Sequence, residues 1–285
     1  MKKRVLLVAS IFAATFTFAQ DGAELTSKKG ETILPEAGDY AIGFNAAPFL
    51  NYAGNLFSSA GNTAPTANFA TPDFSIIGKY FVDAQTAYRG RVRIGFGSST
   101  NKVLTDTSLI ANGGVGRPED QGSYIEDVYK SSYKQITLGA GLEKRKGNTR
   151  IQGYYGGEFL ISFGGSSAKN TYGLEMNDNT TQYSNVGTSR TLSVTGGNMF
   201  GLGLRGFIGA EIFVFPKLSI SAEYGWGLMM STTGETVTKT ENWQLASSTA
   251  TSPSLVETET KTGGSSAFGI DTDNNGGQLN IIFHF

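Results

Sequence analysis

The chain has 285 residues, with 38 Gly, 19 Phe, 12 Tyr and no Cys, and 16% of its residues are charged. The absence of Cys excludes disulfides, thiolate metal sites and Cys nucleophiles, and a formal net charge of −1 gives no indication of a nucleic-acid partner, which would favour a basic stripe. The many Gly residues disfavour a helical protein, because Gly costs a helix about 1 kcal/mol at each position.

The N-terminus has the pattern of a secretory signal peptide over residues 1–19. A basic cluster at 2–4 precedes an apolar stretch that runs to Phe18, and Ala19 completes a small-x-small cleavage site before Gln20. Cleavage there removes the three basic residues and leaves a net charge of −4. No later segment reaches the ~18 apolar residues of a membrane-spanning helix. If the mature chain lies in a membrane, the sequence therefore predicts that it crosses with strands.

From residue 38 onward, apolar and polar residues alternate in successive segments. This alternation is typical of strands with one apolar face, because neighbouring side chains on a strand point to opposite sides. Eight strands are predicted, at about 39–52, 74–82, 87–98, 132–143, 149–163, 198–215, 218–231 and 277–285.

The predicted connections alternate strictly between short and long. Those at 83–86, 144–148 and 216–217 are turns, whereas those at 51–73, 99–131, 164–197 and 232–275 are long and polar. Soluble domains rarely carry four long unstructured loops, but outer-membrane barrels combine short periplasmic turns, long outer loops and an even number of strands. We therefore predict an all-β fold, an eight-stranded antiparallel transmembrane β-barrel at 38–285, which follows a periplasmic linker at 20–37.

Charged residues on the polar faces of these strands indicate what fills the barrel. Three Arg residues at spacing two in 87–98 cannot face lipid, where each would cost about 2–4 kcal/mol near the midplane. The predicted lumen charge network comprises Lys79, Arg89, Arg91, Arg93, Arg150, Arg205, Glu143, Glu158, Glu211 and Glu223. Side chains about fill an eight-stranded barrel, and opposed charges there would pair. We favour a lumen closed by ion pairs; a narrow Arg-lined path is the alternative.

The last strand has an apolar face that ends with the chain. Leu279, Ile281, Phe283 and Phe285 occupy alternate positions. An unpaired apolar strand is an aggregation site, and a closed barrel in lipid removes this problem. The strand also resembles the C-terminal assembly signal of bacterial outer-membrane β-barrels. That resemblance implies recognition by the barrel-assembly machinery and contact with outer-membrane lipid.

Several features together resemble one protein class. The signal peptide, the segment Tyr40-Ala41-Ile42-Gly43-Phe44, the strands rich in Gly and aromatic residues, and the terminal Ile282-Phe283-His284-Phe285 look like a small outer-membrane β-barrel protein of the OmpX/OmpA-like type. A signal peptide that is cleaved just before Gln20 resembles the signal peptides of the Bacteroidetes. The resemblance implies location in the bacterial outer membrane, but no particular activity, because this fold hosts structural, adhesive, channel and enzymatic members.

The inventory of reactive residues disfavours an enzyme. His284 is the one His, and we expect it to point inward at the periplasmic end, away from the outer rim where a His-based hydrolase would need it. Asp271, Asp273 and Asn275 match the start of a calcium loop, but its twelfth position is Ile282, so no metal or cofactor is predicted. We expect a non-enzymatic integral outer-membrane protein that acts structurally or by binding an extracellular or outer-membrane protein through its loops. The alternative is a narrow, passive, porin-like channel for small solutes.

Overall fold

The computed structural model describes residues 25–46, 75–106, 124–176, 188–245, 247–249, 251–272 and 278–285, so the predicted signal peptide at 1–19 lies outside the described residues. The described part of the chain is all-β and antiparallel, with twelve strands. They are β1 (Tyr40–Asn45), β2 (Ile76–Asp83), β3 (Thr86–Asp106), β4 (Tyr124–Lys146), β5 (Ile151–Thr171), β6 (Thr188–Thr195), β7 (Met199–Phe215), β8 (Leu218–Thr233), β9 (Thr236–Leu245), β10 (Pro253–Thr262), β11 (Ser265–Thr272) and β12 (Gln278–His284). None of the described residues belongs to a helix long and apolar enough to cross a membrane.

The strand pairing closes on itself. Following neighbours from β1 leads through β2, β3, β4, β5, β7, β8 and β12 and back to β1, and every pair in this cycle is antiparallel. We call these the ring strands. Three short connections between ring strands, 84–85, 147–150 and 216–217, lie at one end of the ring, which we call the turn end. Where these pairings run, each ring strand has a neighbour on both sides, and this satisfies the main-chain hydrogen bonds of β1 and β12. Beyond Val92, β3 has no described partner on its β2 side.

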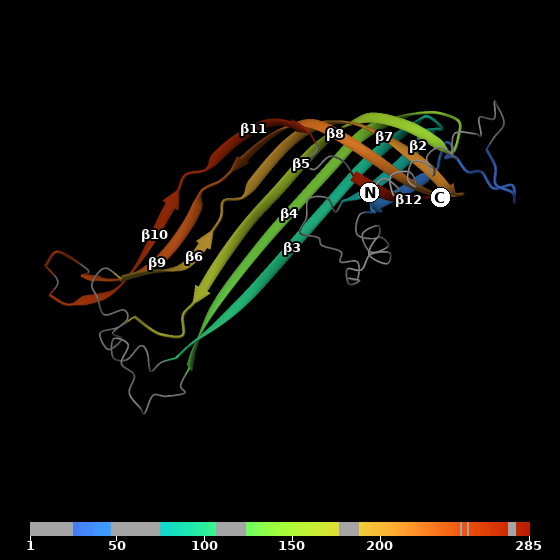
Figure 1. Cartoon of the computed structure of the whole chain (residues 1–285). Coiled ribbons are helices and arrows are strands. Elements are labelled where there is room, and N and C mark those ends of the chain that lie inside the picture. Colours follow the sequence, from blue (N-terminus) through green and yellow to red (C-terminus); the bar gives the residue numbers. More distant parts are fainter. Residues whose placement is uncertain are drawn as a thin grey trace, which may run out of the picture.

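At the end opposite the turns, the sheet continues beyond the ring as an extension. β6 pairs with β5 and β9, β9 pairs with β10, and β11 pairs with β8. Figure 1 shows β6, β9 and β10 at the far end of the long strands β3, β4 and β5, away from β2 and β12. The extension is therefore built partly from ring strands that run on and partly from four shorter strands.

The extension corrects the predicted long loops. Strand structure covers 99–106 and 124–131, 164–171 and 188–195, and most of 232–275, all of which were predicted as loop. These segments are rich in Thr and Ser and lack the apolar alternation on which the prediction depended. Thr nevertheless favours strands, because its branched side chain suits the pleated surface.

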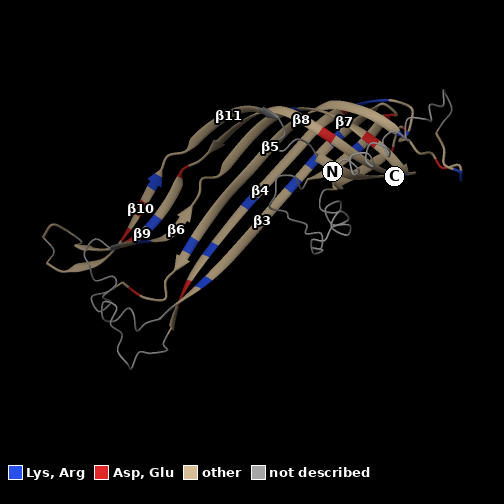
Figure 2. Cartoon of the chain, viewed as in Figure 1, with Lys and Arg blue, Asp and Glu red and all other residues tan. Residues whose placement is uncertain are grey.

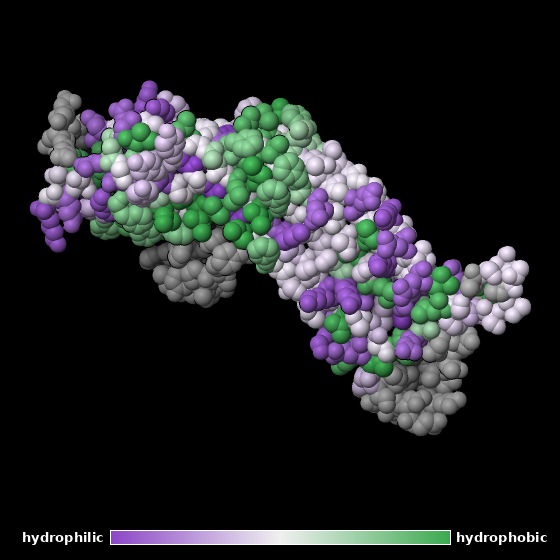
Figure 3. All heavy atoms as spheres, turned by 180° about the vertical axis from the view of Figure 1, so that it is seen from behind, coloured by the Kyte–Doolittle hydropathy of each residue, from purple (hydrophilic) through white to green (hydrophobic). Residues whose placement is uncertain are grey.

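The burial pattern of the ring is inverted relative to a soluble domain. Fully or nearly buried side chains include Arg89, Glu143, Arg145 and Glu211, whereas many large apolar side chains are exposed. Figure 3 shows the hydrophobic surface gathered over the half of the molecule that holds the ring, and a mostly hydrophilic surface on the extension. The core of this protein is thus a charged interior enclosed by an apolar outer surface.

The described part of the predicted linker has a structure of its own. Thr26 forms an isolated β-bridge with Thr32 around a turn at 27–30, and Ile33 is buried. The amide of Gly38 donates to the carbonyl of Phe81 at the end of β2. The segment 25–38 therefore folds back on itself, and its last residue contacts the turn end of the ring.

Candidate functional site

The site that stands out is the network of charged side chains inside the ring. Figure 2 shows acidic and basic positions close together on the strands at the end of the molecule where the C-terminus lies. They face inward because each occupies the alternate positions of a strand whose other face is apolar, as Glu211 does between Ala210 and Ile212. Seven of the eight ring strands contribute a side chain to this network.

The half of the network nearer the turn end is built on two carboxylates. Lys79 Nζ lies 2.8 Å from Glu143 Oε1 and 3.2 Å from Glu211 Oε2. Arg145 Nη1 lies 2.9 Å from Glu143 Oε1 and 3.0 Å from Glu211 Oε2. Both carboxylates have no exposed surface. Two cations thus bridge the same two anions, which offsets the cost of burying all four charges.

The other half places three guanidinium groups around two carboxylates. Arg89 lies 2.6 Å from Glu158 and 2.5 Å from Glu223, and Arg91 lies 3.0 Å from Glu158. Arg205 lies 2.9 Å from Glu223. A longer contact of 3.5 Å between Arg89 and Glu143 joins the two halves.

These contacts cross the lumen instead of following its wall. Lys79 on β2 meets Glu211 on β7, and Arg89 on β3 meets Glu223 on β8, although neither pair of strands is adjacent in the ring. Small residues make room for the large ones. A Cβ at Gly139, for example, would lie 3.0 Å from Arg91 Cβ. The network therefore occupies the cross-section of the lumen.

Two residues of the predicted network, Arg93 and Arg150, do not belong to the ion pairs described above. Arg93 is buried, and its Nη2 donates to Gln135 Oε1 over 3.2 Å. Arg150 is exposed, and its Nη1 donates to the main-chain carbonyls of Phe213 and Val214. The prediction that Arg150 points into the lumen is wrong, because it precedes β5 and lies at the turn end, where strand alternation does not yet hold.

The sequence prediction missed Arg145, which is fully buried and pairs with Glu143 and Glu211. It was assigned to a turn at 144–148, but β4 continues to Lys146. The signal was present in the sequence, since Gly141, Glu143 and Arg145 continue a single period-two alternation.

His284 is buried inside the ring, on the inward face of β12 and beside Lys217 of the last short turn, as predicted. Its Nε2 lies 3.0 Å from both Ser219 Oγ and Glu211 Oε1, and Ser219 also donates to Glu211 over 2.6 Å. A Ser-His-acid triad needs the Ser and the acid on opposite ring nitrogens. Here both use the same nitrogen and Ser219 has no exposed surface, so this trio is a buried polar cluster and not a nucleophile site.

The residues of the predicted assembly signal face outward together. Leu279, Phe283 and Phe285 are exposed and Ile281 is half-buried, while Asn280, Ile282 and His284 between them are buried. β12 pairs with β1 on one side and β8 on the other.

Metal ligands do not gather in the described ranges, where no group of three or more His, Cys, Asp or Glu could hold an ion. The calcium-loop match falls mainly on Asp273 and Asn275, which lie outside the described residues.

Comparison with known proteins does not assign this chain to a family. No protein-family model matches it, and no curated protein matches it. A major outer membrane protein from Thermus thermophilus overlaps with a TM-score of 0.33 and 12% identity, over 88% of this chain and 100% of that chain. A TM-score this low does not establish a common fold.

Proposed function

We propose that the protein is an integral outer-membrane β-barrel of the small OmpX/OmpA-like type, in which the eight ring strands cross the membrane. The observation that carries this proposal is the inverted burial. Exposed apolar residues cover the ring, and charged residues fill it. Lipid is the solvent that suits such a surface, and a closed ring is the β-structure that lipid tolerates, because it leaves no main-chain group unpaired.

The apolar surface has the height that a membrane requires. On β3 the outward apolar side chains run from Tyr88 to Phe96, and the row at Val92 continues through Leu138, Ile161, Leu202 and Met230 on the neighbouring strands. A spanning strand needs about 9–11 residues. The part of β3 beyond these apolar residues, 97–106, adds roughly 30 Å to the length of the strand.

The extension is the part that we propose to be exposed at the cell surface. We place the turn end in the periplasm and the extension outside the cell, since outer-membrane barrels have short periplasmic and long outer connections. The face of the extension that Figure 3 shows is mostly hydrophilic, with scattered hydrophobic residues. The proposed role is therefore non-enzymatic and consists of binding an extracellular or outer-membrane protein through the extension.

Topology is testable with inserted epitope tags. A tag in the exposed segment 247–249, between β9 and β10, is expected to bind antibody on intact cells. The matched control is a tag at Gly147, in the turn between β4 and β5, which is expected to bind only after the outer membrane is permeabilised. Labelling of the Gly147 tag on intact cells, or absence of the protein from the outer-membrane fraction, would contradict the proposal.

The charge network supports a closed lumen over the channel alternative. Its cross-lumen ion pairs are buried, and separating them to admit a solute would leave unpaired charges. The purified protein is expected to be silent in planar bilayers. Stepwise conductance that changes with Arg89→Ser would establish the channel instead.

A further inference from the structure

The lumen holds a cavity beyond the charge network, on the side of the extension. Its volume is about 360 Å³, and its lining includes Leu160, Gly203, Met229 and Gly269. These four residues are successive cross-strand partners on β5, β7, β8 and β11. They therefore form one row of the sheet and share one face, whereas Leu204, Leu228 and Phe268 of the same lining have the alternate phase.

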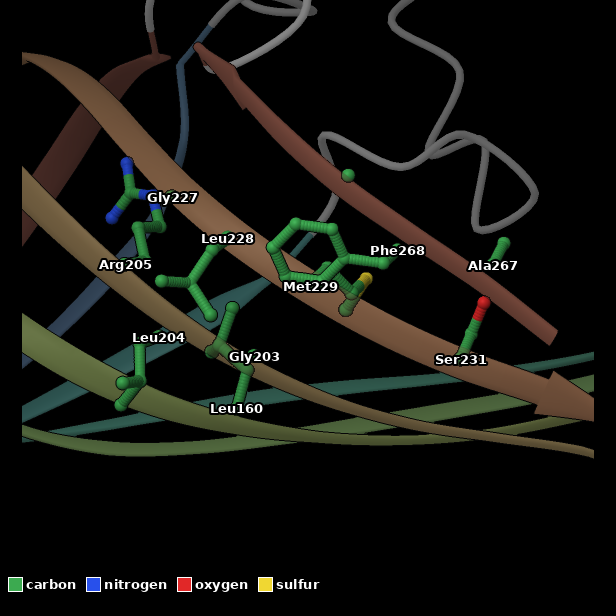
Figure 4. Close-up of a pocket in the computed structure, with 11 residues that line it drawn as sticks. Leu160, Gly203, Leu204, Arg205, Gly227, Leu228, Met229, Ser231, Ala267 and Phe268 are labelled. Atoms are coloured by element: carbon green, nitrogen blue, oxygen red, sulfur yellow. The ribbon is translucent and has the colours of Figure 1, made fainter.

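That face is the inward one. Leu160 lies between the outward Phe159 and Ile161 and in phase with the buried Glu158 and Ser162. Figure 4 shows Arg205 at one end of the cavity, Ser231 and Ala267 at the other, and Met229 between them. Leu160 and Met229 are thus apolar side chains that point into the lumen beyond the charge network.

The inner end of the cavity is basic. Arg205 is buried there and borders the cavity, and it pairs with Glu158 and Glu223. The excess charge is basic, because Arg89, Arg91 and Arg205 surround these two carboxylates. Arg91 belongs to the same row as Leu160, through Gly139, and Arg93 belongs to the next row outward. The described members of these two rows on β3, β4, β5, β7, β8 and β11 include no Asp or Glu.

We propose that this cavity binds a small anion that carries an apolar chain, with its carboxylate toward Arg205 and its chain against Leu160 and Met229. A guanidinium with a planar fork suits a carboxylate, and the apolar wall suits methylene groups. Because the ion pairs close the lumen below the cavity, the ligand enters and leaves from the extension side. This ligand site goes beyond the protein-binding role proposed above and does not depend on it.

The probe is octanoate, titrated calorimetrically into the full-length protein in phosphatidylcholine nanodiscs, with empty nanodiscs as the blank. Saturable 1:1 binding is expected. In Gly203→Leu the new side chain starts 3.5 Å from Leu160 Cβ and 3.6 Å from Met229 Cε and fills the cavity, so affinity is expected to fall at least tenfold. Gly78→Leu is the matched control, because Gly78 is on the outer surface with open space around it, and its affinity is expected to be unchanged.

Two further ligands test the proposed chemistry on the wild-type protein, so the result does not depend on whether the variants fold. Octyltrimethylammonium is expected not to bind, because the inner end of the cavity is basic. Butanoate is expected to bind at least tenfold more weakly than octanoate, since it loses four buried methylenes. Failure of octanoate to saturate, equal binding of the cation, or equal loss in Gly78→Leu and Gly203→Leu would overturn the proposal.

Discussion

Glu211 shows how much a single buried charge matters in this barrel. It has no exposed surface and lies within hydrogen-bond distance of Lys79, Arg145, Ser219 and His284. Replacing one partner of a buried ion pair leaves the other charge uncompensated, which costs about 3–5 kcal/mol. Glu211→Gln keeps the size of the side chain and removes its charge, so we expect a loss of about that magnitude in the free energy of unfolding, measured by urea titration in lipid vesicles.

Glu126→Gln is the matched control for that experiment. Glu126 pairs with Lys102 over 2.8 Å, but both side chains are well exposed on the extension. Exposed pairs contribute about 0–1 kcal/mol. Equal losses in the two variants would contradict the account of the lumen as a closed, water-excluding network.

Lys217 carries the backbone strain of the tightest turn. Its φ of 65° lies in the left-handed region, and Pro216 precedes it, as in a type II turn that favours Gly at this position. Its ion pair with Asp39 is exposed and long, at 3.6 Å, so little is lost with the side chain. Lys217→Gly is expected to raise the free energy of unfolding by about 0.5–1 kcal/mol in the same urea assay. A decrease would show that the side chain stabilises the turn.

At the scale of single residues, sequence alternation predicted the interior well where a strand was already recognised. Arg89, Arg91, Arg205 and the four Glu residues of the network are buried and paired as predicted. Arg145 and Arg150 were assigned to the wrong environments for one common reason. Each lies within a residue of a strand boundary, and alternation says which face a residue takes but not where the strand ends.

Among the elements, the β9–β10 hairpin offers a direct test of whether the ring folds without the extension. Thr233 pairs with Ser265, and Thr236 pairs with Thr262, so excising 236–262 leaves Gly234, Glu235, Gly263 and Gly264 as a four-residue turn between β8 and β11. Because every ring pairing survives this excision, the variant is expected to insert into vesicles and keep its heat-modifiable migration in gels. Loss of insertion would show that the ring depends on the hairpin.

Strand β10, which the sequence did not predict, has no apolar face. Where one side of a strand is apolar and the other faces the lumen, as on β7, the period-two pattern is strong. β10 has polar residues on both faces, such as Glu257 and Thr258, so its pattern carries no contrast. What fixes β10 is its register with β9, which is a property of the pairing and not of either segment alone.

At the scale of the whole molecule, the terminal strand and the closure of the ring were foreseeable from one physical requirement. An apolar strand needs a partner on each side, and β12 has β1 and β8. The shape of the extension was not foreseeable, because it depends on how far the polar strands continue beyond the apolar surface of the ring. Figure 1 shows that this region makes up a large part of the length of the molecule.

The central claim is that the outer surface of the ring contacts acyl chains. Because the chain has no Cys, single-Cys spin labels can be placed cleanly, and Ile94 and Leu104 are both exposed on the same face of β3. In vesicles, a label at Ile94→Cys is expected to collide more with oxygen than with a water-soluble nickel chelate, and a label at Leu104→Cys is expected to show the reverse. Nickel accessibility at position 94 equal to that at position 104 would contradict the claim.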